Sequence, residues 1–372
     1  MSRTLRMTAL ALVALCGALG VARAQEPEKP QAEFQGKVNV NEVLLDVLVT
    51  DAKGNVIVGL DKNDFVVKEN GKPVALTGVT FYSNRRLLES SPKLAKQGVS
   101  VDQATDDRYF VLFFQDQKET AQEAPKLLSQ QLEAAKRAKG WVDGELLPND
   151  WVAVVSFDTR LKVQQDFTHD KRNLVAAIDD AMKGADPEGN FPSRINAKGP
   201  SLLAGLPRGN ELRNKTPNVY EAMQQIARSA GNIRGRKNLL LFTYGLPGRE
   251  NTFGSFVPDD RYFNPTVRIL NNNNVAVYSL DLTPAAVEHT LSDSLNLLSK
   301  DTGGRYFFNI TNFSTPLDQM AKENNGYYLL SYESNQPAGK SGFQDVEVKT
   351  NNPELRLKSR KGYEYGSKEL GK

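Results

Sequence analysis

A short polar stretch offers the best candidates for chemistry in this chain: Gln115-Asp116-Gln117-Lys118-Glu119-Thr120. It follows residues 108–114, which are almost all apolar or aromatic and predict a central strand buried on both faces. Residues 120–139 come next, with apolar or small side chains at helical spacing. Strand, polar turn and helix open a doubly wound α/β domain, which binds ligands at the carboxyl ends of its strands. We therefore expect the functional site at residues 115–120.

Carboxylates are the side chains in this stretch that could act in catalysis. Asp116 and Glu119 could serve a hydrolase if they formed an acid and base pair about 5–9 Å apart in a deep pocket. Other enzyme signals are weak: His169 and His289 have no second ligand type at metal spacing, and neither G-x-S-x-G nor G-x-G-x-x-G occurs. We expect a protein that is not an enzyme, with a carboxylate-based hydrolase as the alternative.

The amino terminus has the pattern of a secretory signal peptide. Arg3 and Arg6 form a basic start, residues 9–15 are apolar, and Ala22-Arg23-Ala24 is an A-x-A cleavage site. The apolar run is too short for a transmembrane anchor. We therefore expect removal of residues 1–24 and a secreted or periplasmic protein.

Removal of the signal peptide changes the charge and the cysteine count. The full chain has 47 Lys plus Arg against 44 Asp plus Glu, and the three arginines of residues 1–24 account for the difference. The mature chain therefore has a net charge of zero, and nothing global favours nucleic acid or an anionic membrane as partner. Cys16 is the single cysteine, so the mature chain has no disulfide and no thiolate site.

Short strands precede the predicted α/β domain. The expected ones are at 43–49, 55–60, 65–68 and 76–82. Asn70-Gly71 adds a strong hairpin signal. About four strands in so few residues cannot form an independent sandwich core.

Strands and helices alternate from residue 107 to 325, which predicts a mostly parallel sheet. The expected strands are 108–114, 151–157, 161–167, 238–243, 275–280 and 305–308. The connection at Asp158-Thr159 is tight, so we expect residues 161–167 to form an antiparallel edge strand. Asp170 is expected to cap one helix, and Thr216 a later helix that starts at Pro217.

Strand patterns return near the carboxyl end, at 327–332, 343–349 and 355–359. Together with the strands before residue 84 they number about seven, the size of a β-sandwich. We expect the two ends of the chain to pair into one sandwich with the α/β domain inserted. The alternative is two small β extensions packed on the α/β domain.

A series of motifs in order carries a resemblance to a known family. They lie at residues 47–54, 59–60, 64–65, 69–71, 108–114, 150–157, 235–242, 277–281, 301–304, 326–332 and 360–363. In these residues the chain resembles the von Willebrand factor A-like (VWA) domain, and more narrowly the VWFA-related (acidobacterial-type) family of secreted bacterial proteins. The resemblance covers nearly all of the chain after the signal peptide.

The resemblance implies a place for a metal ion. In this fold the first strand ends in D-x-S-x-S, a later loop supplies a Thr, and an Asp follows the fourth strand, which gives a hard divalent cation its oxygens. Aligned on the strand end, the three positions are Gln115, Gln117 and Glu119; shifted by one they are Asp116, Lys118 and Thr120. Tyr244 stands where the aspartate is usual, and Thr216 is the nearest candidate for the threonine.

The resemblance thus implies a degenerate metal-ion-dependent adhesion site, and we expect no cofactor. A looser Ca²⁺ or Mg²⁺ site on Asp116 and Glu119 is one alternative, and a solvated polar turn on an inert scaffold is another.

Residues 184–216 form the most unusual insertion. They are rich in Gly, Pro, Asn and Arg, and are either a binding loop or disordered. The basic residues, Arg194, Lys198, Arg208, Arg213 and Lys215, outnumber the acidic ones, Asp186, Glu188 and Glu211. As a binding loop, this insertion would present a weakly basic surface to an acidic protein partner.

The predicted organisation is a signal peptide at 1–24, a spacer at 25–36, sandwich strands at 37–83, a linker at 84–106, the VWA-like domain at 107–325 and further sandwich strands at 326–366. By resemblance, the function is non-enzymatic protein binding or adhesion through a rim. The rim residues are Gln115, Asp116, Gln117, Glu119, Thr120, Thr216 and Tyr244. Besides the hydrolase, a purely structural envelope protein is the alternative.

Overall fold

A computed structural model describes residues 41–83, 107–116, 124–187, 199–250, 256–284, 292–334 and 340–366. The predicted signal peptide, spacer and linker lie outside these ranges. None of the described helices combines the length and the apolar character needed to cross a bilayer.

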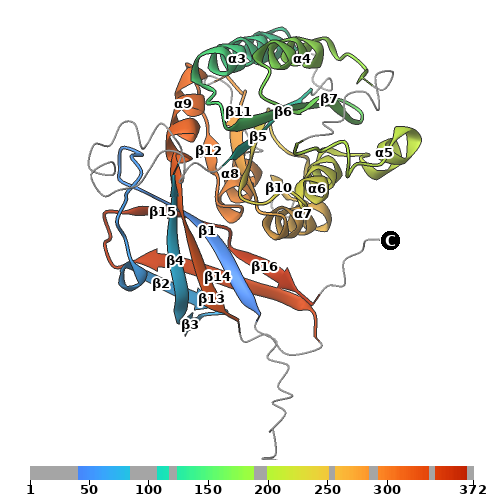
Figure 1. Cartoon of the computed structure of the whole chain (residues 1–372). Coiled ribbons are helices and arrows are strands. Elements are labelled where there is room, and N and C mark those ends of the chain that lie inside the picture. Colours follow the sequence, from blue (N-terminus) through green and yellow to red (C-terminus); the bar gives the residue numbers. More distant parts are fainter. Residues whose placement is uncertain are drawn as a thin grey trace, which may run out of the picture. The chain divides into compact units, whose positions relative to one another are not determined.

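A six-stranded sheet forms the centre of the α/β region (Figure 1). Its strand order is β12 (Arg305–Phe307), β11 (Val275–Asp281), β8 (Lys237–Thr243), β5 (Arg108–Gln115), β6 (Asp150–Phe157) and β7 (Leu161–Thr168). All neighbours are parallel except β7, which is antiparallel to β6 at the edge. The predicted fold class, including the antiparallel edge strand, is confirmed.

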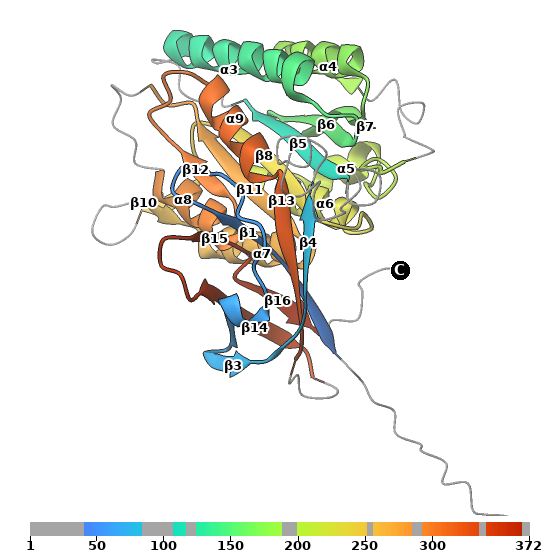
Figure 2. The same cartoon turned by 60° about the vertical axis from the view of Figure 1, so that its left-hand side comes forward.

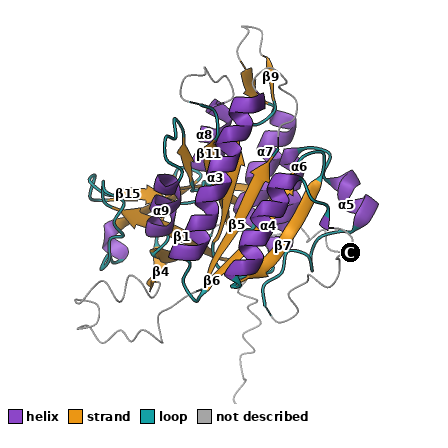
Figure 3. Ribbon diagram, turned by 90° about the horizontal axis from the view of Figure 1, so that it is seen from above, coloured by secondary structure: helices purple, strands orange, loops and turns teal. Residues whose placement is uncertain are grey.

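Helices cover both faces of this sheet because β5 alternates its side chains between two apolar cores. Phe110, Leu112 and Phe114 pack with one group of helices, while Val111 and Phe113 pack with another. The first group is α3 (Ala124–Glu145), α4 (Lys171–Lys183) and α9 (Ser314–Glu323). The second is α5 (Gly209–Lys215), α6 (Val219–Ala230), α7 (Asp260–Asn272) and α8 (Ser292–Asp301). Figures 2 and 3 show α3 and α4 lying across β5, β6 and β7.

Two antiparallel sheets combine strands from both ends of the chain. One has the order β15 (Arg356–Lys358), β1 (Glu42–Thr50), β13 (Gly326–Glu333) and β4 (Leu76–Ser83). The other has the order β16 (Gly362–Tyr365), β14 (Gly342–Thr350), β2 (Phe65–Glu69) and β3 (Lys72–Val74). Apolar residues of both sheets share one core. The predicted β-sandwich is therefore confirmed, and the alternative of two separate β extensions is wrong.

Some local predictions were wrong. Residues 55–60 contribute a single bridge, from Val56 to Thr50, because turn hydrogen bonds occupy the start of this run. The helix predicted from Pro217 begins at Val219, and its cap is Asn218, whose side chain accepts a hydrogen bond from the backbone of Glu221. Asn is a better helix cap than Thr, which explains the shift. By contrast, Asp170 caps α4 as predicted.

The described parts of the long insertion are folded, so disorder is the wrong prediction for residues 199–216. Leu202, Leu203, Leu206 and Leu212 are buried in the core beneath α6. A short helix, α5, forms within the insertion. Residues 188–198, which include Arg194 and Lys198, lie outside the described residues.

Two further short strands, β9 (Gly248–Glu250) and β10 (Phe256–Pro258), form a hairpin after β8. A single 3-10 turn, η1 (Lys62–Asp64), precedes β2.

Candidate functional site

The carboxyl ends of the parallel strands form one edge of the six-stranded sheet. The register pairs Gln115 of β5 with Phe157 of β6, and Thr243 of β8 with Asp281 of β11. β5 and β8 are direct neighbours, so Gln115 and Tyr244 lie at the same edge, as the sequence predicted. We call this edge the carboxyl rim; its described residues are 115–116, 157–162, 243–246 and 281–283.

Gln115 occupies the first position of the implied metal pattern, but its side chain is used within the protein. It is 4% exposed, and its amide oxygen accepts a hydrogen bond of 2.7 Å from the hydroxyl of Thr243. The carbonyl of Gly245 lies 2.8 Å from the same hydroxyl, which accepts from the backbone N–H of Gly245 at 3.0 Å. These bonds fix the turn after β8 against the end of β5.

Tyr244, in the position of the family's aspartate, is buried and bonded to helix α3. Its hydroxyl donates to the carbonyl oxygen of Leu127. Burial raises the pKa of the phenol, and the charge of Asp116 raises this pKa further. The side chain is therefore neutral at physiological pH and supplies no anionic oxygen.

Asp116 is the described carboxylate closest to the predicted site. Its backbone N–H donates to the carbonyl of Phe157 at 2.8 Å, which holds the residue against the end of β6. Gln117, Glu119 and Thr120 lie outside the described residues, so the predicted pairing of Asp116 with Glu119 is not described. Within the ranges the structure describes, no three His, Cys, Asp or Glu side chains are grouped to hold a metal. The described side chains of Gln115 and Tyr244 are hydrogen-bonded inside the protein and do not fit the ligand positions of a divalent cation.

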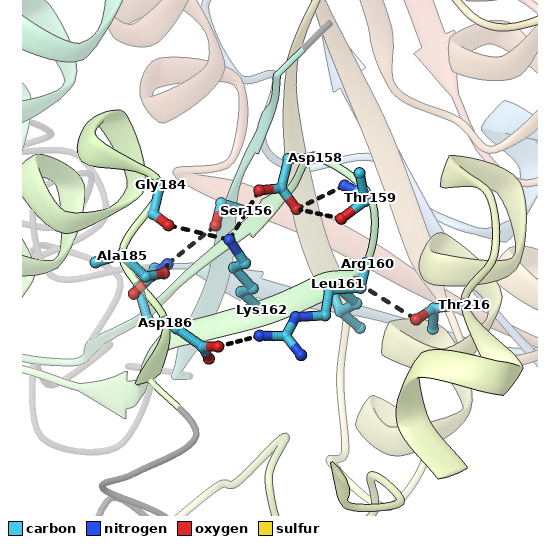
Figure 4. A network of polar contacts seen from close by, with 11 residues as sticks. Ser156, Asp158, Thr159, Arg160, Leu161, Lys162, Gly184, Ala185, Asp186 and Thr216 are labelled. Atoms are coloured by element: carbon cyan, nitrogen blue, oxygen red, sulfur yellow. Dashed lines mark hydrogen bonds and ion pairs between the residues drawn. The ribbon is translucent and has the colours of Figure 1, made fainter. Parts of the chain in front are cut away.

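Thr216 is brought to the carboxyl rim, but its hydroxyl is already engaged. The residue is buried at the end of α5, and the hydroxyl donates to the carbonyl of Leu212 at 2.8 Å. The backbone N–H of Leu161 points at the same oxygen from 3.4 Å (Figure 4). Thr216 therefore joins the insertion to the turn between β6 and β7.

That turn carries a polar network that sequence reasoning missed (Figure 4). Lys162 donates to Asp158 at 2.8 Å and to the carbonyl of Gly184 at 3.0 Å. Burial would raise the pKa of Asp158, but the hydrogen bonds from Lys162 and from the backbone of Thr159 outweigh it and lower the pKa to about 2. The i,i+4 spacing of Asp158 and Lys162 across a tight turn was the available signal.

The start of the insertion is anchored on the same network. Arg160 forms an ion pair with Asp186, and Gln164 donates to the carbonyl of Ala185 at 2.8 Å. Further along, the backbone of Leu202 donates to Asp166 at 2.7 Å. The basic residues of α5 and its start remain on the surface: Arg208, Arg213 and Lys215, the last paired with Glu211.

A groove lies along α3, beside the residue that Tyr244 contacts. Its volume is about 580 Å³, and Thr311 and Phe313 complete the wall opposite the helix. Leu128 is 53% exposed and Leu132 50% exposed in this groove. Both belong to the apolar pattern of the sequence, which does not distinguish them from the buried Leu127.

Comparison with known proteins gives similarity in fold only. No protein-family model and no curated protein matches the chain. Manganese-loaded TRAP protein of Plasmodium vivax is 9% identical over 76% of this chain and 96% of its own, with a TM-score of 0.39. An aerotolerance-related membrane protein of Bacteroides fragilis is 13% identical over 58% and 98%, with a TM-score of 0.33.

The ArnB paralog VWA2 of Sulfolobus acidocaldarius is 9% identical over 86% of this chain and 74% of its own, with a TM-score of 0.32. These similarities are too low to transfer a function, and the fold assignment here rests on the order and direction of the strands. Membership of the narrower VWFA-related family stays a prediction. The α/β region has the VWA-like fold that the sequence predicted.

Proposed function

We propose that this chain is an exported, non-enzymatic binding protein that contacts a protein partner through the carboxyl rim and the adjoining groove on α3. The observation that carries the proposal is the pair of half-exposed leucines, Leu128 and Leu132, in one groove. Neighbouring exposed apolar side chains in a hollow are typical of interaction surfaces, whereas single ones are common everywhere.

The bonding of the rim supports binding rather than catalysis. The amide oxygen of Gln115 and the hydroxyls of Thr243 and Tyr244 form hydrogen bonds with one another or with the backbone. Lys162 keeps Asp158 ionised. A general base would need a pKa near the working pH, and Asp158 is far from that range.

We propose that partner binding is independent of divalent cations. Shape complementarity and apolar contacts would then hold the partner, and no carboxylate of the partner would need to bind a metal ion on this chain. The exposed basic residues of the insertion, Arg208 and Arg213, favour an acidic surface on the partner.

The test is capture of cell-envelope proteins on the immobilised chain, in Mg²⁺ and in EDTA. We expect one partner to be recovered equally in both and to be lost, by at least tenfold, in the Leu128→Arg/Leu132→Arg variant. Leu44→Arg, at a leucine 49% exposed on β1, is the matched control and should bind as the unmodified chain does.

Calorimetric titration with Mg²⁺, Mn²⁺ and Ca²⁺ should give no micromolar binding. Capture that requires Mg²⁺, or cation binding that is lost in Asp116→Ala, would contradict the proposal.

A further inference from the structure

A second hollow lies at the opposite edge of the six-stranded sheet, near the amino end of β12. It has a volume of about 340 Å³ and is enclosed by the turn after β1, the end of α9, the start of β12 and strand β15. Its charged lining residues are Lys53, Arg305, Lys322, Arg356 and Lys358 on the positive side and Asp51 and Glu323 on the negative side. We call this the basic hollow; five cations face two carboxylates.

Both carboxylates of the basic hollow are already engaged. Asp51 accepts hydrogen bonds from the backbone N–H groups of Lys53 and Asn55, each at 2.8 Å, and from the side chain of Asn55 at 2.6 Å. Glu323 is 2% exposed and forms ion pairs with both Arg305 and Lys358. One buried carboxylate is thus shared by two cations.

Among the described residues, the remaining three cations have no ion-pair partner, and only the charge of Asp51, which is hydrogen-bonded to neutral groups, opposes them. Within the described parts of the chain, Lys53, Lys322 and Arg356 form no ion pair with a carboxylate, and all three are exposed. The ammonium of Lys322 lies 3.5 Å from the carbonyl of Lys53. Hydrogen bonds from Asn55 are the main cause of the lowered pKa of the Asp51 carboxyl, and the positive charge of Lys322 lowers this pKa a little further.

The pKa of Lys358, in the wall of the basic hollow, is affected mainly by burial and, to a smaller extent, by neighbouring positive charges. Burial lowers the pKa of Lys358, Glu323 raises it in part, and Arg305 and Arg236 lower it again, to about 8. Like charges held together in a hollow repel one another and attract anions. Arg356 adds a planar guanidinium, which suits carboxylate and phosphate oxygens.

We propose that the basic hollow binds a small ligand that carries at least two negative charges on carboxylate or phosphate oxygens. Exposed Lys53, Lys322 and Arg356 contact the ligand directly, and Arg305 and Lys358 supply positive charge from the wall. The ligand sits at the edge opposite the carboxyl rim, so this site is independent of the proposed protein-binding function.

Calorimetric titration of the purified chain with pyrophosphate, and separately with citrate, tests the proposal at pH 7 and low ionic strength. We expect saturable binding of at least one of the two anions, and the tighter one identifies phosphate or carboxylate as the recognised group. Lys322→Gln/Arg356→Gln should weaken this binding at least tenfold. Arg137→Gln/Arg172→Gln removes two exposed cations from α3 and α4 and should leave the affinity within twofold.

Absence of saturable binding by both anions would overturn the proposal. An equal loss in both double variants would overturn it too, because net charge alone would then explain the attraction. All four substituted side chains are on the surface, and matching thermal unfolding curves will show that each variant is folded.

Discussion

Polar side chains at the carboxyl rim are matched to partners inside the protein. Gln115 is bonded to Thr243, and Tyr244 to the backbone of α3. Because a buried polar group without a partner costs about 1–3 kcal/mol, each of these bonds constrains the residues beside it. The positions that the sequence resemblance assigned to a cation here hold strand ends and a helix together.

Tyr244→Phe tests this structural role. The substitution leaves the carbonyl of Leu127 without the phenol as donor, so we expect a loss of about 1–2 kcal/mol in the free energy of unfolding. Urea unfolding measures the change. Tyr82→Phe is the control, since its hydroxyl has no hydrogen-bond partner in the described part of the chain, and its change should stay within about 0.5 kcal/mol. Equal losses would mean that the Tyr244 bond is not stabilising.

Short connections determine how closely the elements pack, as the turn between α8 and β12 illustrates. Gly303 has a φ of +77°, and a Cβ on Gly304 would lie 1.9 Å from the carbonyl oxygen of Val277. Glycine at position 304 therefore lets this turn pack against the backbone of β11. At the scale of elements, this turn also sets where Arg305 enters the basic hollow.

Gly304→Ala should be strongly destabilising. The added methyl group meets backbone atoms that cannot move aside, so we expect a loss of at least about 2 kcal/mol. Gly140→Ala, in α3, is the matched control: its Cβ would meet nothing within 4 Å, and helix propensity predicts a gain of about 0.5–1 kcal/mol. Denaturant unfolding of the two variants would contradict this account if both changed stability in the same direction.

Buried charges join the sandwich to the α/β region at the scale of the whole molecule. Arg360, which follows β15, donates to the carbonyls of Asn271 and Leu44, both at 2.7 Å. Lys237 at the start of β8 is 2% exposed, and its ammonium donates to the carbonyl of Ile233 at 2.9 Å. Burial lowers the pKa of Lys237 to about 8, against a partial opposite effect of Asp46 and a further lowering by Arg360.

The lowered pKa of Lys237 makes the free energy of unfolding rise with pH. Between pH 8 and 10.5 the unfolded chain binds the Lys237 proton and the folded chain does not, so stability rises with pH across this window. Lys237→Met removes the effect. We therefore expect the stability of the unmodified chain, relative to the variant, to rise by about 2 kcal/mol from pH 7.5 to 10.

Urea unfolding at half-unit pH steps checks this expectation. Lys358 has a pKa lowered in the same direction, but it is present in both proteins and cancels in the difference. A difference that is flat or falls with pH would contradict the assignment.

Local patterns in the sequence were sufficient for the main elements. Residues 109–114 are all apolar or aromatic because β5 is covered on both faces, and Asp170 caps α4 because its side chain reaches two backbone N–H groups. The sequence also predicted that Gln115 lies at the same edge as Thr243 and Tyr244, since parallel strands end at a common edge. The pairing of the chain's two ends followed from strand number alone.

Other features depend on contacts between distant residues, which no local pattern encodes. The glycines and prolines of the insertion indicated a loop, yet Leu202 and Leu206 find a buried surface against α6 once the sheet exists. Leu128 and Leu132 share the spacing of buried neighbours, and only the position of α3 on the sheet leaves them exposed. The basic hollow draws its cations from segments about 300 residues apart.

The sequence was sufficient for the main strands and helices and for which strand ends share an edge, because these follow from hydrophobic period and chain direction. Which side chains form hydrogen bonds inside the protein, and which face solvent, became visible only in the tertiary structure. Burial, side-chain pairing and local excess charge all depend on which distant segments lie next to each other, and this is settled only when those segments have packed.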